Sequence, residues 1–199
     1  MQIRFEQLAA RLEQGLAPIY VVTGDEPLQH TEATDAIRAA ARAAGYTARE
    51  VHEAGNDFDW NRLSESADSL SLFSDRRLVD LRIPGGKPGR DGGAALAAWA
   101  ERPPEDTLLL VSLPRIDPQS RKSKWYKALD KAGVTLPVWP VEIGQLPAWI
   151  AKRMRARGLQ PDNDAVSLLA ARCEGNLLAA AREIDKLLLL GGAGPVDAA

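Results

Sequence analysis

The sequence has little of what metal sites and thiol chemistry require. It contains one cysteine, Cys173, and two histidines, His30 and His52, which are far apart in the chain. A single cysteine excludes a disulfide bond within the chain, and these three residues match no zinc-ligand spacing. They also offer no cysteine–histidine pair for nucleophilic catalysis. We therefore expect no metal ion and no cysteine-dependent active site.

Long hydrophobic runs are missing as well. No stretch of about 18 apolar residues occurs, so no membrane span is expected, and the first residues, Met1–Glu6, lack the pattern of a secretory signal peptide. The chain has 199 residues, of which 45% are hydrophobic and 26% are charged, a composition typical of soluble globular proteins that bury a core. We expect a cytoplasmic protein.

Charge is unevenly distributed along the chain. Residues 1–114 carry 12 basic and 18 acidic side chains, residues 115–157 carry 10 and 3, and residues 158–199 carry 3 and 6. Only the middle block favours a polyanion. Its basic residues alternate with Trp125 and Tyr126, which is typical both of nucleic-acid-binding surfaces and of solvated helix faces. The candidate DNA contacts are the lysines beside these aromatic residues: Lys122, Lys124 and Lys127.

Periodicity predicts an α/β domain over residues 1–142. Short apolar or alternating runs predict strands at residues 19–22, 48–54, 77–83, 107–111 and 134–138. Amphipathic or alanine-rich segments predict helices at about residues 5–12, 27–44, 60–69, 94–101 and 122–132. Strands that alternate with helices are typical of a mostly parallel sheet with helices on both faces.

From Gln145 onward the pattern indicates helices alone. Glycines at positions 158, 175 and 191 end three successive amphipathic segments, and Asn163 or Asp164 and then Asn176 provide helix caps. We expect a three-helix bundle over residues 143–199.

The turn after the first predicted strand is where a phosphate-binding P-loop would lie. Counted from Gly24, the P-loop pattern requires glycine, lysine and serine or threonine where this sequence has Gln29, His30 and Thr31. Glutamine restricts the backbone that would wrap a phosphate, and a mostly neutral histidine replaces the fixed positive charge. We expect a degenerate nucleotide site with no bound cofactor and no ATPase activity.

Two other functions remain open at this stage. Lys87 or Arg90, in the glycine-rich stretch 85–93, is a candidate replacement for the missing lysine in a divergent P-loop ATPase or phosphotransferase. That stretch follows no phosphate-binding fingerprint and also fits a flexible connection. The basic block alternatively suggests a DNA-binding module.

The stretch Ser69-Leu70-Ser71-Leu72-Phe73 lies between a predicted helix and a predicted strand. Its apolar side chains have two possible uses: they fold back as a lid on the core, or they project as a plug into a pocket of another protein.

Several short motifs, in their order and spacing, resemble the delta subunit of the bacterial DNA polymerase III clamp loader. They are Gly24-Asp25-Glu26-Pro27-Leu28, Asp59-Trp60-Asn61 leading to Leu70–Phe73, Ser123-Lys124-Trp125, Gln145-Leu146-Pro147 with Trp149, and Glu174-Gly175-Asn176-Leu177-Leu178-Ala179. The resemblance extends from residue 1 to about residue 190.

The resemblance implies an AAA+-like domain without ATPase activity, followed by a three-helix lid-like domain. It further implies a non-catalytic subunit that binds and opens the sliding clamp (the beta subunit), and that works with other clamp-loader subunits on primed DNA. The implied clamp-binding element is Leu70, Ser71, Leu72 and Phe73, with Leu72 and Phe73 as the central plug. Asp68 departs from the glutamine with which family motifs often begin, and the collar domain of family members is not expected within these 199 residues.

Overall fold

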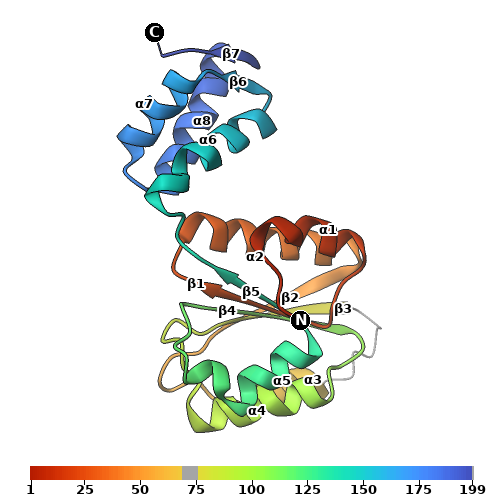
Figure 1. The fold of residues 1–199 in the computed structure, drawn as a ribbon. Helices are drawn as coiled ribbons and strands as arrows, with labels where there is room; N and C mark the ends of the chain where they lie inside the picture. Colours follow the sequence, from red (N-terminus) through yellow and green to blue (C-terminus); the bar gives the residue numbers. More distant parts are fainter. Residues whose placement is uncertain (69–75, 199) are drawn as a thin grey trace. The chain divides into compact units, whose positions relative to one another are not determined.

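The structure is a computed structural model that describes residues 1–68 and 76–198 (Figure 1). The chain forms two compact units, Met1–Trp139 and Pro140–Ala199. The clamp-binding residues implied by the sequence, Leu70, Ser71, Leu72 and Phe73, lie outside the described residues.

The first unit is built on a five-stranded parallel sheet. The strands are β1 (Ile19–Gly24), β2 (Tyr46–Glu53), β3 (Arg76–Arg82), β4 (Thr107–Leu113) and β5 (Val134–Val138). Their order across the sheet is β2-β3-β4-β1-β5, and every neighbouring pair is parallel. The predicted α/β class with a parallel sheet is confirmed.

Helices cover both faces of this sheet (Figure 1). They are η1 (Phe5–Gln7), α1 (Leu8–Glu13), α2 (Pro27–Ala43), α3 (Asn61–Asp68), α4 (Gly89–Glu101), η2 (Ser120–Lys122) and α5 (Lys124–Ala132). All seven residues of β4 are buried. Leu108 and Leu110 pack on the α2 side, whereas Leu109 and Val111 pack on the side of α4 and α5. Because both faces of β4 are covered, its sequence is a continuous apolar run.

The expectation of a flexible connection over residues 85–93 is wrong in its second half, because α4 begins at Gly89. A Cβ atom on Gly92 would lie 2.4 Å from the Trp60 ring, and one on Gly93 would lie 3.2 Å from the Trp125 ring. These glycines therefore allow close packing of α4 against two indoles. Their number suggested backbone freedom, whereas their role is to leave room for large neighbours.

The second unit begins with the short helix η3 (Ile143–Gln145). Its three α-helices pack against one another: α6 (Leu146–Ala156), α7 (Asn163–Cys173) and α8 (Leu177–Gly191). Asn176 caps α8 as predicted, whereas α7 is capped by Asp162 and not by the predicted Asn163 or Asp164. The expectation of helices alone is wrong, because β6 (Leu159–Pro161) pairs in parallel with β7 (Gly194–Val196). In the part of the chain that the structure describes, no helix has the length and apolar character needed to cross a bilayer.

Candidate functional site

A cleft of about 420 Å³ lies at the carboxyl ends of β1, β3 and β4. In open parallel sheets this edge is the usual place for ligands, and P-loop proteins hold phosphates there. The cleft is lined by Gly24, Asp25, Pro27, His30, Thr31, Glu53, Arg82, Ile83, Pro84, Ser112, Leu113 and Pro114. It is the candidate remnant of a nucleotide site.

The first turn of α2 already holds an anionic group from the chain itself. Glu26 is the N-cap of α2, and its Oε2 atom accepts a hydrogen bond from the Gln29 backbone N–H at 2.5 Å. Both residues are buried, with 5% of Glu26 and 7% of Gln29 exposed. Backbone N–H groups at such a helix start are the donors that bind phosphate in P-loop proteins. A carboxylate therefore occupies a donor that a phosphate would need.

The structure brings three of the four degenerate P-loop residues to the cleft. Gly24, His30 and Thr31 line it, whereas Gln29 is buried behind the helix start. Gly24 has a φ of 135°, and a Cβ atom there would lie 1.9 Å from the Val138 carbonyl oxygen. This glycine is thus required by its close approach to β5.

His30 does not supply the positive charge that the missing lysine would provide. Burial lowers the pKa of its imidazole below the ordinary value of 6.5, although the carbonyl groups of Leu113 and Val22 act in the opposite direction. At pH 7 the imidazole is therefore neutral.

Two cleft residues, Glu53 and Arg82, were missed by sequence reasoning. They are register partners at the ends of β2 and β3, so both side chains project from the same face of the sheet. Among the described residues that line the cleft, Arg82 carries the single fixed positive charge, against the carboxylates of Asp25 and Glu53. The signal for these residues was the charge at the end of each predicted strand.

Lys87 and Arg90 are not at this cleft. Lys87 lines a separate hollow of about 310 Å³, where its Nζ atom lies 3.8 Å from the Asp117 carboxylate. Arg90 lies in the first turn of α4 and lines another hollow beside Lys124. Neither side chain replaces a P-loop lysine in this arrangement, which counts against the ATPase or phosphotransferase alternative.

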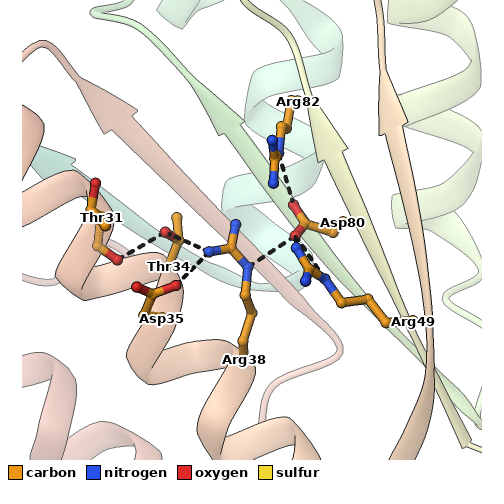
Figure 2. A network of polar contacts seen from close by, with 7 residues as sticks. All are labelled: Thr31, Thr34, Asp35, Arg38, Arg49, Asp80 and Arg82. Atoms are coloured by element: carbon orange, nitrogen blue, oxygen red, sulfur yellow. Dashed lines mark hydrogen bonds and ion pairs between the residues drawn. The ribbon is translucent and has the colours of Figure 1, made fainter.

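A buried carboxylate lies near the cleft, on β3 (Figure 2). The Asp80 side chain is fully buried, and its Oδ2 atom accepts hydrogen bonds from Arg38 Nε at 2.9 Å and from Arg49 Nη2 at 2.6 Å. Its Oδ1 atom accepts no hydrogen bond in the described structure, and Arg82 Nε lies 3.9 Å from it. Asp80 therefore faces three guanidinium groups.

Arg38 extends this Asp80 network along α2. Its Nη1 atom donates to Asp35 at 2.7 Å and to Thr34 Oγ1 at 3.2 Å, and the Thr34 hydroxyl donates to the Thr31 carbonyl oxygen at 3.0 Å. Burial acts to lower the pKa of the Arg38 guanidinium, but the two aspartates outweigh it and raise that pKa above its ordinary value. The network thus connects the cleft residue Thr31 with Asp80 on β3 (Figure 2).

The candidate DNA-binding lysines lie on one continuous segment. Lys122 ends η2, Lys124 is the first residue of α5, and Lys127 follows one turn later; all three are exposed. Lys124 Nζ lies 3.5 Å from the exposed Glu101 carboxylate. No group of three or more acidic, histidine or cysteine side chains in residues 1–68 and 76–198 is arranged to hold a metal ion.

The Asp80 network leads to a first prediction. Asp80→Asn keeps the side-chain volume but leaves buried or half-buried guanidinium groups without their carboxylate, so we expect the free energy of unfolding to fall by about 3 kcal/mol. Urea denaturation followed by circular dichroism measures this value. Asp106→Asn, which removes an exposed ion pair with Arg76 of 3.9 Å, is the matched control and should change the value by less than about 1 kcal/mol. Equal effects of the two variants would contradict a structural role for Asp80.

The lowered pKa of His30 leads to a second prediction. In the unfolded chain the imidazole titrates at its ordinary value, so as the pH falls through about 6.5 the unfolded state takes up a proton that the folded state does not. The free energy of unfolding of the wild type therefore falls as the pH is lowered through this range. In His30→Gln it should fall less, because the variant has no imidazole at this position. Urea denaturation at several pH values between about 5 and 8 measures the difference. His52→Gln, which leaves His30 in place, should retain the loss, and a His30→Gln profile parallel to that of the wild type would contradict the assignment.

Comparisons with known proteins agree with this geometry. The family model described as DNA polymerase III, delta subunit, matches residues 20–138. DNA polymerase III subunit delta of Escherichia coli K12 is 31% identical over 185 residues, and that of Haemophilus influenzae is 28% identical over 190 residues. Each match covers 93% of this chain and 54% of the relative, so the chain spans about half the length of these curated relatives.

Solved structures show the fold. The Bacillus subtilis DNA clamp loader delta protein superposes with a TM-score of 0.72 at 17% identity, over 97% of this chain and 60% of that chain. The Thermotoga maritima RuvB Holliday junction branch migration motor gives a TM-score of 0.53 at 13% identity, over 94% of this chain and 64% of that chain. The predicted AAA+-like fold is confirmed. With the family model matched over residues 20–138, the chain belongs to the family of DNA polymerase III delta subunits.

Proposed function

We propose that this chain is a non-catalytic clamp-loader subunit that binds and opens the sliding clamp during DNA replication in the cytoplasm. The observation that carries the non-catalytic part is the buried Glu26 carboxylate at the start of α2, bonded to the Gln29 N–H at 2.5 Å. A triphosphate in this position would meet a negative charge where P-loop proteins offer free N–H donors. The neutral His30 adds no compensating charge.

Opening a ring requires no bond chemistry from the subunit that binds it. A ligand shifts a conformational equilibrium by the difference between its affinities for the two states. This chain therefore needs only to bind the open form of the clamp more tightly than the closed form, and ATP hydrolysis belongs to partner subunits.

We propose that Leu70, Leu72 and Phe73, with Ser71 between them, contact the clamp. Each apolar side chain contributes about 1.5–3 kcal/mol when fully desolvated, which supports micromolar or tighter binding after ordering costs are subtracted. The segment that carries them connects α3, which ends at Asp68, to β3, which begins at Arg76. The Asp80 network supports this role. It connects β3, the strand that follows the segment, to α2.

Other partners belong to the same proposal. The remaining clamp-loader subunits bind this subunit within the complex, and primed DNA is contacted through the phosphate-binding capacity of Lys122, Lys124 and Lys127. The exposure of all three lysines supports this contact.

Clamp binding is the direct test. The double variant Leu72→Ala/Phe73→Ala should weaken binding to the purified sliding clamp at least about a hundredfold, because it removes both side chains of the central plug. Surface plasmon resonance with immobilised clamp measures the affinity. The matched control is Leu189→Ala/Leu190→Ala, which removes two apolar side chains that are 84% and 88% exposed on α8. Unchanged affinity in the Leu72/Phe73 variant would rule out this contact.

Nucleotide titration tests the non-catalytic role separately. Isothermal titration calorimetry with Mg²⁺ and ATP should give no saturable heat, because Glu26 occupies a phosphate donor and the position of the P-loop lysine holds a neutral His30. The one fixed cation among the described residues of the cleft lining, Arg82, comes from β3 and already lies 3.9 Å from the Asp80 carboxylate. The divergent ATPase or phosphotransferase predicts binding that Lys87→Ala or Arg90→Ala abolishes. Saturable binding lost in either variant would overturn our proposal in favour of that enzyme.

A further inference from the structure

An exposed indole with two arginines against it lies next to the cleft, although none of these three residues lines it. Trp139 is 41% exposed. The guanidinium carbon of Arg115 lies 5.1 Å from the centroid of its ring, and that of Arg121 lies 5.2 Å from the same centroid. Both distances are within the range of cation–π attraction. This Arg115–Arg121–Trp139 cluster lies in the basic block 115–157 and contains none of the three lysines proposed above as DNA contacts.

The backbone segments that carry the two arginines are held in place. The Arg115 N–H donates to Asp25 Oδ1 at 2.9 Å. The backbone just before Arg121 is held by Asp117. Its Oδ1 atom accepts hydrogen bonds from the backbone N–H groups of Gln119 at 2.9 Å and Ser120 at 2.8 Å. The cluster is therefore formed before any ligand binds, which lowers the entropic cost of binding.

The positive charge of the cluster is not neutralised. In residues 1–68 and 76–198, neither the Arg115 nor the Arg121 guanidinium has an ion-pair partner, in contrast to Arg38 and Arg49, which both bind Asp80. Two like charges held against one ring repel each other, and an anion placed between them relieves that repulsion. The exposed Lys122 adjoins Arg121 and adds a third positive charge.

We propose that the Arg115–Arg121–Trp139 cluster is a binding site for single-stranded DNA. Unpaired bases stack on indole rings and on guanidinium planes, while phosphates pair with the guanidinium charges. Paired bases in a duplex do not expose their faces in this way, so the aromatic component favours a single strand. An acidic peptide would satisfy the charges but would make no use of the exposed indole. The site is separate from the clamp contact and does not depend on it.

Fluorescence anisotropy with labelled oligothymidylate tests the site on the 199-residue chain. Trp139→Leu should weaken binding about tenfold, whereas Trp139→Phe, which keeps an aromatic ring, should retain most of the affinity. Arg115→Gln/Arg121→Gln should also weaken binding, and it should reduce the slope of log K against log salt by about 1.4, since each neutralised phosphate on a single strand contributes about 0.7.

Matched controls separate this site from general effects. Trp149→Leu removes an indole that also has an arginine against it, Arg153 at 5.2 Å, and Arg102→Gln removes an exposed arginine elsewhere in the first unit. Both should bind as the wild type does. Thermal unfolding of each variant shows whether it is folded, and the arginine double variant and Trp139→Phe still test the site if Trp139→Leu does not fold.

Four results would overturn the proposal. They are wild-type affinity in Trp139→Leu, equal losses in Arg102→Gln and the Arg115/Arg121 variant, duplex binding as tight as single-strand binding, and displacement of the oligonucleotide by polyglutamate at the same charge concentration. If the first of these results is accompanied by loss of binding in Lys124→Gln/Lys127→Gln, the proposed lysine contact is supported in place of the tryptophan site. Clamp binding by the Trp139 and arginine variants should remain unchanged, so failure of either proposal is visible on its own.

Discussion

The first unit depends on how one buried carboxylate is neutralised. Asp80 lies within β3, where a lone charge would be strongly unfavourable, and it is compatible with the fold because Arg38 on α2 and Arg49 on β2 both bind it. The same contacts join a helix and two strands at the side of the sheet where α2 leaves β2 partly exposed; Val51 there is 50% exposed. The ion pairs of Asp80 thus attach β2 and β3 to α2 at a place where β2 is partly exposed.

The cleft in the first unit has the backbone framework of a P-loop site. The parallel sheet, the turn at Gly24 and the start of α2 are all present. What differs is the charge: a buried carboxylate from Glu26 is bonded at the helix start, and His30 is neutral. The Glu26 carboxylate interacts favourably with the dipole of α2, so the chain supplies its own negative charge at this helix start.

Sequence reasoning succeeded where a single segment determines the outcome. The apolar run 107–111 identified β4 because both of its faces are buried. The degenerate P-loop also rests on adjacent residues, and it stays a prediction. It failed where distant residues decide. Arg38 and Arg49 are 42 and 31 residues from Asp80, so nothing local marked their contacts. Likewise, Gly92 looked like a loop residue because the Trp60 ring that requires it comes from a distant segment, the turn before α3.

The internal cap on α2 also bears on timing. An ATPase alternates between two states because its anionic ligand is bound, cleaved and released, whereas the anion at this helix is covalently part of the chain and never leaves. In the role proposed above, this unit would therefore have no bound nucleotide to switch its affinity for the clamp, and release of the clamp would depend on the other subunits of the assembly.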